Sequence, residues 1–210
     1  MASHMAWDVH PGVAHVQAIL RNLPLNTGRD LEAWVAAVKA QGPADEKGRR
    51  AWLKAQGLGG AQAMFVAERS LGASAHAFDD TPEGYLAAAQ GYVDAQYAGK
   101  KAALRPCFEA LVRLARSLGS DVRLSPCETI VPIYRAHVIA QIKPFASRLD
   151  LGLALGDPGG LEDPGGRLID TGGFVAKKER RSVKLEVRSE ADLDADLLGW
   201  LRRAYDRDQA

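Results

Sequence analysis

The stretch DVRLSPCETIVPIYRAHVIAQIKPFASRLDLGLAL, from Asp121 to Leu155, decides the fold, because it is the only long region dominated by strand-type alternation. Near its end, every second residue is a leucine, and these leucines share one face: Leu149, Leu151, Leu153 and Leu155. Arg148, Asp150 and Gly152 fall on the opposite face. A side-chain period of two predicts a half-buried strand. The segment RSVKLEV, residues 181–187, alternates in the same way, with its apolar residues facing inward.

Helical periodicity dominates the chain on both sides of this stretch. The spacing of apolar residues and the capping residues predict helices at Val13–Leu23 (ending before Pro24), from Thr27 as N-cap to Gly42, at Asp45–Gln56, at Ala61–Leu71, from Thr81-Pro82 to Tyr97, at Ala103–Leu118 and at Asp192–Arg207. The apolar side of the last helix is expected to hold Leu193, Leu197, Leu198, Leu201 and Tyr205.

These elements predict an α+β fold, with a small N-terminal helical bundle followed by a helix-flanked antiparallel sheet. The sheet is expected to have four or five strands and to form a two-layer sandwich with its helices. We expect a helical domain at residues 13–72, a linker at residues 73–81 and an α+β domain at residues 82–208. The first residues, 1–5 (MASHM), look like a cloning scar.

The composition is that of an ordinary globular protein. Lys and Arg together number 27 and Asp and Glu 26, so a net charge of +1 gives no global attraction to nucleic acid or anionic lipid. No apolar run approaches the roughly 20 residues that span a bilayer, and no signal peptide is recognised, so we expect no membrane partner. Two cysteines without a zinc-type spacing favour reduced thiols in a cytoplasm and no metal site. No cofactor is expected.

Polar residues of the sheet are the first candidate site. If the helices leave one face of the sheet open, Tyr134, Arg135, Lys143, Arg148 and Asp150 could line a surface that binds an anionic or polar ligand. Asp150 could also fix the guanidinium of its neighbour Arg148, so that the arginine presents an ordered fork to the ligand. The simpler interpretation is a solvated sheet face with cross-strand ion pairs.

The turn Gly57-Leu58-Gly59-Gly60 is the second candidate. This turn matches the pattern of helix-hairpin-helix elements, which is glycine, an apolar residue and glycine, with alanine four residues on. In those elements the backbone N–H groups contact a DNA phosphate. Lys54 could add charge beside Gly57, Gly59 and Gly60. A plain corner between two helices needs the same glycines, so both interpretations stay open.

No catalytic group is predicted. Cys107 lies in a helical apolar stripe, and Glu128 would oppose ionisation of the neighbouring Cys127. His137, at an expected hairpin turn, is not by itself evidence for a general base. The aromatic stripe of Tyr85, Tyr92 and Tyr97 is expected to pack in the core, although a homo-oligomer formed through this helix is an alternative.

Two parts of the chain resemble known families. AWLKAQGLGGAQA (51–63) resembles domain of unknown function 4287, a small bacterial helical domain. Five segments resemble domain of unknown function 5655, which is loosely labelled as transport-related: VDAQYAGKKAALRPCFEAL (93–111), SPCETIVPIYRAHVIAQIKP (125–144), RLDLGLAL (148–155), LIDTGGF (168–174) and LLGWLRRAY (197–205). The resemblance implies no established activity and no catalytic residues.

The same resemblance marks positions that recur in the second family. They are Thr129, Val131, Pro132, Arg135, Pro144, Arg148, Asp150, Leu151 and Gly152. The chain departs from the pattern at Ile130 and Ile139, where aromatic residues are usual, and at Arg180-Arg181, where a Thr-His pair often stands. This last departure argues against a histidine-based role near that strand.

Together these observations predict a bacterial cytoplasmic binding protein. Its ligand is expected to be small and anionic or polar, and to bind at the sheet or at a groove between the domains. One alternative is a nucleic-acid-binding accessory protein that uses the Gly57–Gly60 turn. The other is an enzyme acting on small molecules.

Overall fold

The computed structural model describes residues 5–72 and 81–208, and it divides the chain into two compact units. One unit is Val9–Ala88, and the other combines Ala89–Ala210 with Met1–Asp8. Most of the linker predicted at residues 73–81, and most of the segment 1–5, lie outside the described residues. The division between the units falls within helix α6, which spans Pro82–Gln96.

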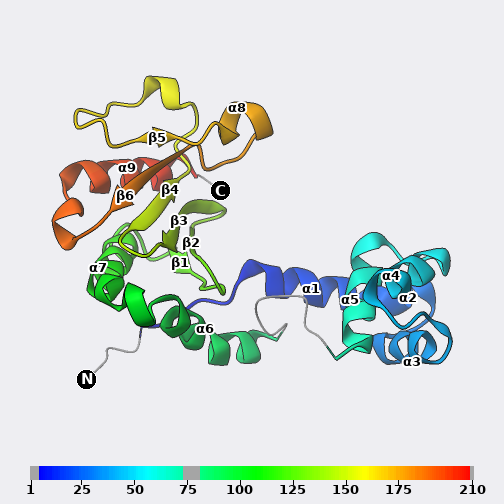
Figure 1. Ribbon diagram of the computed structural model, residues 1–210. Coiled ribbons are helices and arrows are strands. Elements are labelled where there is room, and N and C mark those ends of the chain that lie inside the picture. The colour runs from blue at the N-terminus through cyan, green and yellow to red at the C-terminus, as the bar shows by residue number, and fades with distance from the viewer. Residues whose placement is uncertain (1–4, 73–80, 209–210) are drawn as a thin grey trace. The chain divides into compact units, whose positions relative to one another are not determined.

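The unit Val9–Ala88 is a small helical bundle (Figure 1). Its helices before α6 are α1 (Pro11–Arg21), α2 (Leu23–Thr27), α3 (Leu31–Gln41), α4 (Glu46–Ala55) and α5 (Gly60–Ser70). Eight buried apolar residues form its core: Leu23, Trp34, Val38, Leu53, Leu58, Ala63, Val66 and Ala67. The predicted bundle is therefore confirmed.

One predicted cap in this unit is wrong. Thr27 does not cap α3 but is the last residue of α2, where its hydroxyl donates to the carbonyl of Leu23 at 2.7 Å. Asp30 is the N-cap of α3 instead, and its carboxylate accepts from the N–H of Ala33 at 2.8 Å. The left-handed Gly28 separates the two helices, with φ of 73°. The proline expected to end the first helix, Pro24, instead lies in the first turn of α2, a position that needs no N–H.

The second unit is built on an antiparallel sheet with strand order β1-β2-β3-β4-β6-β5. The strands are β1 (Arg123–Leu124), β2 (Val131–Tyr134), β3 (Val138–Pro144), β4 (Leu149–Leu153), β5 (Ile169–Asp170) and β6 (Val183–Val187). The prediction of four or five strands is too low, because β1 and β5 have two residues each and show no alternation. After β4 the chain runs to the edge strand β5 and returns through α8 (Gly173–Lys177) to pair β6 with β4.

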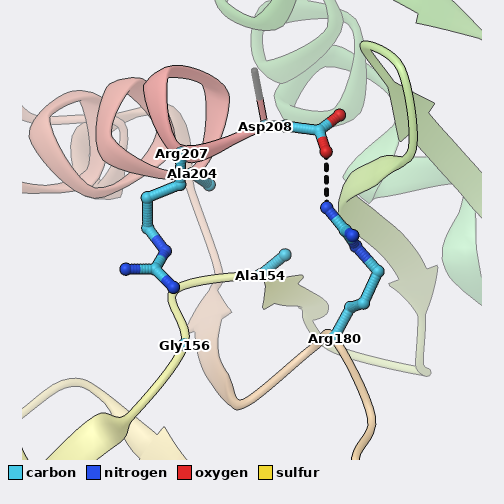
Figure 2. Close-up of a pocket in the computed structure, with 6 residues that line it drawn as sticks. All are labelled: Ala154, Gly156, Arg180, Ala204, Arg207 and Asp208. Carbon is cyan, nitrogen blue, oxygen red and sulfur yellow. Dashed lines mark hydrogen bonds and ion pairs between the residues drawn. The ribbon is translucent and has the colours of Figure 1, made fainter. Parts of the chain in front are cut away.

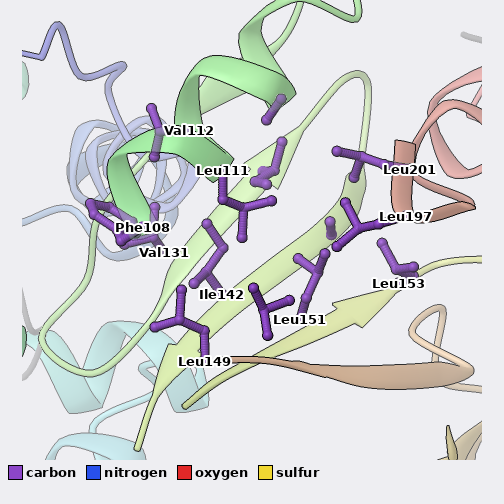
Figure 3. Packing of buried hydrophobic residues seen from close by; sticks show 14 of the residues in the cluster. Phe108, Leu111, Val112, Val131, Ile142, Leu149, Leu151, Leu153, Leu197 and Leu201 are labelled. Carbon is purple, nitrogen blue, oxygen red and sulfur yellow. The ribbon is translucent and has the colours of Figure 1, made fainter. Parts of the chain in front are cut away.

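Helices cover one face of this sheet, so the unit has the two layers that were predicted (Figure 3). These helices are α7 (Arg105–Arg116) and α9 (Ala195–Arg207). A 3-10 turn precedes each of them: η1 (Gly99–Leu104) before α7 and η3 (Glu190–Asp192) before α9. A third 3-10 turn, η2 (Pro158–Gly160), lies in the loop after β4. The alternating leucines of β4 point into this layer, and Leu149, Leu151 and Leu153 are fully buried. The predicted α+β fold is confirmed.

The apolar side of α9 differs in detail from the prediction. The helix begins at Ala195, because Asp194 caps it by accepting from the N–H of Leu197 at 3.0 Å. Leu198 is 37% exposed and lies outside the core, whereas Trp200 is buried. The indole of Trp200 donates to the carbonyl of Glu162 at 3.0 Å, so a polar partner makes its burial favourable.

Candidate functional site

The face of the sheet opposite the helices is polar, and it brings three of the predicted site residues together. Lys143 on β3 is the cross-strand partner of Asp150 on β4, and Asp150 is in turn the partner of Glu186 on β6. Arg148 lies in the β3–β4 turn and reaches onto the same face, where it meets Asp150. We call this surface the outer face; its residues are Lys143, Phe145, Arg148, Asp150, Gly152, Arg181, Lys184, Glu186 and Arg188.

Asp150 is the centre of the outer face. Its carboxylate accepts from Nε of Arg148 at 2.8 Å and from Nζ of Lys184 at 2.9 Å. Burial disfavours the charged form of Asp150, but the two cations outweigh it and hold the pKa below the usual aspartate range. Asp150 is only 8% exposed, so β4 is more completely covered than the half-buried strand predicted from the alternation.

Arg148 is held in one orientation from three directions. Its Nε donates to Asp150 and lies 3.1 Å from Glu186 Oε1, while its guanidinium stands 4.9 Å from the ring centroid of Phe145. Hydrogen bonding to Asp150 raises the pKa of Arg148, which therefore stays charged. Among the described residues, none accepts a hydrogen bond from its two terminal nitrogens. The arginine thus presents the ordered fork that was anticipated.

Cations outnumber carboxylates on the outer face. Lys143 is exposed, and its only partner within the described chain is the ring of Phe145, at 5.5 Å. Arg181 lies over the other end of β4, where a Cβ at position 152 would be in ordinary contact with its Cδ at 3.6 Å. Lys184, Arg148 and Arg188 share the two carboxylates of Asp150 and Glu186. The surface can therefore accept an anion without first losing an ion pair.

Two of the predicted residues lie elsewhere. Arg135 is in the β2–β3 turn, at the opposite end of β3 from Lys143. It donates to Asp121 at 2.8 Å and stacks over the ring of Tyr205 at 4.2 Å, so it anchors the end of α9 rather than the outer face. Tyr134 is 9% exposed, and burial raises the pKa of its phenol to about 12. The structure therefore does not group Arg135 and Tyr134 with Arg148.

Sequence analysis missed the contribution of β6. Lys184 and Glu186 occupy outward positions of the alternating segment 181–187, so the pattern already showed which way they point. What the pattern could not show is that β6, rather than β5, pairs with β4. That pairing places Lys184 and Glu186 against Asp150 and Arg148.

The turn at Gly57–Gly60 joins α4 to α5, as predicted. Gly57 has φ of 96°, and Gly59 is the N-cap of α5 with its N–H bonded to the side chain of Gln62 at 3.0 Å. Cε of Lys54 would lie 3.9 Å from a Cβ added at Gly60. Lys54 therefore lies beside the first amides of α5.

Neither thiol is suited to nucleophilic chemistry. Burial raises the pKa of Cys107 to about 11 and, together with the charge of Glu128, does the same for Cys127. A thiolate is the nucleophilic form, and both thiols are protonated at neutral pH. The structure does bring one acid beside a histidine: His137 Nδ1 lies 3.0 Å from Asp208, across 71 residues of sequence.

Other predicted features can be located as well. Tyr85 and Tyr97 are buried and Tyr92 is half-buried, which agrees with a packing role for this stripe. Within residues 5–72 and 81–208, no cluster of three or more His, Cys, Asp or Glu side chains could hold a metal ion. In the same residues, no helix combines the length and the apolar character needed to cross a membrane.

Residues 93–208 match the model of the family described as domain of unknown function (DUF5655). The chain belongs to the DUF5655 family. The match begins within α6 and ends at Asp208, so the DUF5655 region contains the whole outer face. No curated protein matches the chain, and neither does any solved structure.

Proposed function

We propose that this DUF5655 protein binds a small anionic ligand on its outer face, with Arg148 as the central contact. The observation that carries the proposal is the orientation of Arg148: its Nε is occupied by Asp150 and Glu186, and its two terminal nitrogens are left for a ligand. A carboxylate or phosphate can accept two parallel hydrogen bonds from such a fork. Because the fork is already ordered, binding costs little side-chain entropy.

Lys143 and Lys184 give this site its charge. Lys143 is the cross-strand partner of Asp150 on β3. It is exposed, so it can reach an anion held by Arg148. Lys184 is tied to Asp150 and completes a positive rim. Asp150 acts as a support that fixes two cations and does not itself meet the ligand. An enzyme on small molecules is a weaker hypothesis here, because the described partners of Asp150 are cations rather than a histidine or a cysteine.

Substituting Arg148 by lysine tests the proposal, since lysine keeps the charge and loses the fork. We expect phosphorylated sugars, nucleotides or dicarboxylates to raise the melting temperature of the protein at constant ionic strength. Arg148→Lys should weaken the response by about tenfold in affinity or more, as loss of a charge-assisted hydrogen bond implies. Arg188→Lys is the matched control, because the Arg188 side chain is 66% exposed and its only partner within the described residues is Glu186. If Arg148→Lys, which keeps the charge, bound the ligand as well as the wild type, general charge and not the fork would bind the ligand.

A second candidate function is nucleic-acid binding through the Gly57–Gly60 turn, supported by the position of Lys54 beside the N-terminus of α5. We expect the affinity for short duplex DNA to fall steeply with added salt and to drop on Lys54→Ala or Gly59→Val. Gly59 has φ of −63°, so valine there adds bulk over the amides without left-handed strain. Lys39→Ala, on α3, is the control. A salt-insensitive response would remove this candidate.

We further infer that the helical unit Val9–Ala88 is a DUF4287 domain, on the resemblance of AWLKAQGLGGAQA at residues 51–63. The resemblance of both parts to bacterial domains, together with two free cysteines, favours a bacterial cytoplasmic protein. A homo-oligomer is also part of this proposal; its test is the mass in solution.

A further inference from the structure

A cavity lies in the DUF5655 region, and its lining residues are not those of the outer face. Its volume is about 240 Å³, and it opens between the end of β4 and the last turn of α9 (Figure 2). It is lined by Ala154, Gly156, Arg180, Ala204, Arg207 and Asp208. None of these six residues belongs to the outer face.

Arg207 forms one wall of this cavity and is seated against Gly156. A Cβ at position 156 would overlap the terminal nitrogens of Arg207, and the φ of Gly156 is 78°, so only glycine leaves this seat open. No carboxylate within residues 5–72 and 81–208 forms an ion pair with Arg207. Within these residues its charge is not neutralised, and its side chain lies on the opposite side of the cavity from Arg180 (Figure 2).

Arg180 forms the opposite wall and is tethered by a buried carboxylate. Asp208 is 2% exposed and pairs with the terminal Nη2 of Arg180. It also accepts from the backbone N–H of His137 at 2.7 Å and lies 3.0 Å from His137 Nδ1. Burial opposes ionisation of Asp208, but the hydrogen bonds from His137 and the charge of Arg180 hold its pKa below the usual range. Both oxygens of Asp208 are thus engaged, and it holds Arg180 at the cavity wall.

We propose that this cavity is a binding site for a compact oxyanion, namely phosphate or the phosphate group of a small metabolite. Arg180 and Arg207 line it from opposite sides and one carboxylate, that of Asp208, balances them, so the lining carries a net positive charge. Guanidinium groups bind phosphate through paired hydrogen bonds. The size limits the ligand to a small one, because the cavity volume is only about 240 Å³. Pockets for drug-sized ligands begin at roughly 300 Å³, so a nucleotide does not fit inside it.

Titration calorimetry with inorganic phosphate, at neutral pH and constant ionic strength, tests this site. We expect the wild-type chain to bind, and Arg207→Gln and Arg180→Gln each to weaken binding by about tenfold or more. Arg207 is exposed, so its substitution leaves the fold intact. Arg203→Gln is the matched control, because Arg203 is an exposed arginine on the same helix that does not line this cavity.

One more variant, Arg148→Gln, distinguishes binding in the cavity from binding on the outer face. In Arg148→Gln, which removes the central contact of the outer face, titration with phosphate should still shift the amide resonances of Ala154 and Gly156. If phosphate at millimolar concentration gives neither heat nor shifts, or if Arg207→Gln binds as well as the wild type, the proposal is overturned. Loss of binding on Arg148→Gln alone would also overturn it, and would place phosphate on the outer face. Glycerol phosphate distinguishes free phosphate from the phosphate group of a metabolite. Binding equal to that of phosphate indicates a site for the phosphate group of a metabolite, and weaker binding indicates a site for free phosphate.

Discussion

Replacing Leu151 by alanine is expected to lower the free energy of unfolding of the DUF5655 region by about 3 kcal/mol, within the range measured for buried leucines. Leu151 is fully buried at the middle of β4, and its cross-strand partners are Ile142 and Leu185. Leu197 and Leu201 of α9 complete the layer above the strand (Figure 3). The surrounding strands are held by backbone hydrogen bonds and cannot collapse into the space, so most of the cavity penalty should remain. Urea denaturation measures the change in free energy. Hydrogen exchange of peptides from β3 and β4 assigns it to the unit that contains the sheet.

Leu198→Ala supplies the comparison. Leu198 lies on α9, one residue after the buried Leu197, and is 37% exposed. Its truncation removes little buried surface and should change the free energy of unfolding by less than about 1 kcal/mol. If Leu151→Ala cost no more than Leu198→Ala, the alternating leucines would not form the centre of the core.

The alternation of residues 149–155 was sufficient to predict the fold because it is local information. Side chains at every second position must share a face, whatever the strand pairs with. The stop at Gly42 is local in the same sense, and α3 ends and α4 begins close to where the sequence places them. The predicted cap at Thr27 is wrong because Asp30, directly before the first residue of α3, caps the helix instead.

The site was predictable only in its local part. Arg148 and Asp150 are two residues apart, so their pairing could be anticipated from the chain itself. Lys184 and Glu186 join them only because the chain passes through β5 before β6 returns beside β4, a topology that no periodicity encodes. Arg135 was grouped with them because it occurs on the same predicted sheet. The strand order and the length of β3 place it at the other end.

Replacing Asp150 by asparagine is expected to destabilise the DUF5655 region by about 2 kcal/mol at neutral pH. Removing one partner of a buried ion pair costs roughly 3–5 kcal/mol, but Arg148 and Lys184 keep side-chain exposures of 30% and 35%, so water can partly replace the carboxylate. The same substitution should weaken ligand binding on the outer face, because Arg148 loses the bond that orients it. Glu128→Gln is the control for loss of one negative charge, because Glu128 is exposed and forms no ion pair within residues 5–72 and 81–208. Thermal and urea unfolding measure the stability, and the melting-temperature response measures the binding.

The dependence on pH separates this role of Asp150 from simple packing. The folded pKa of Asp150 lies below the ordinary aspartate value of 3.8, so folding favours the ionised form. The stability that Asp150 contributes is therefore complete above about pH 5 and is lost as the pH falls through 3.8 towards the folded pKa. Wild type and Asp150→Asn should accordingly differ most at neutral pH and converge in acid, while Leu151→Ala should stay below the wild type by a similar amount throughout. A difference between wild type and Asp150→Asn that did not shrink in acid would contradict an electrostatic origin, and Asp150 would then stabilise the sheet by its shape alone.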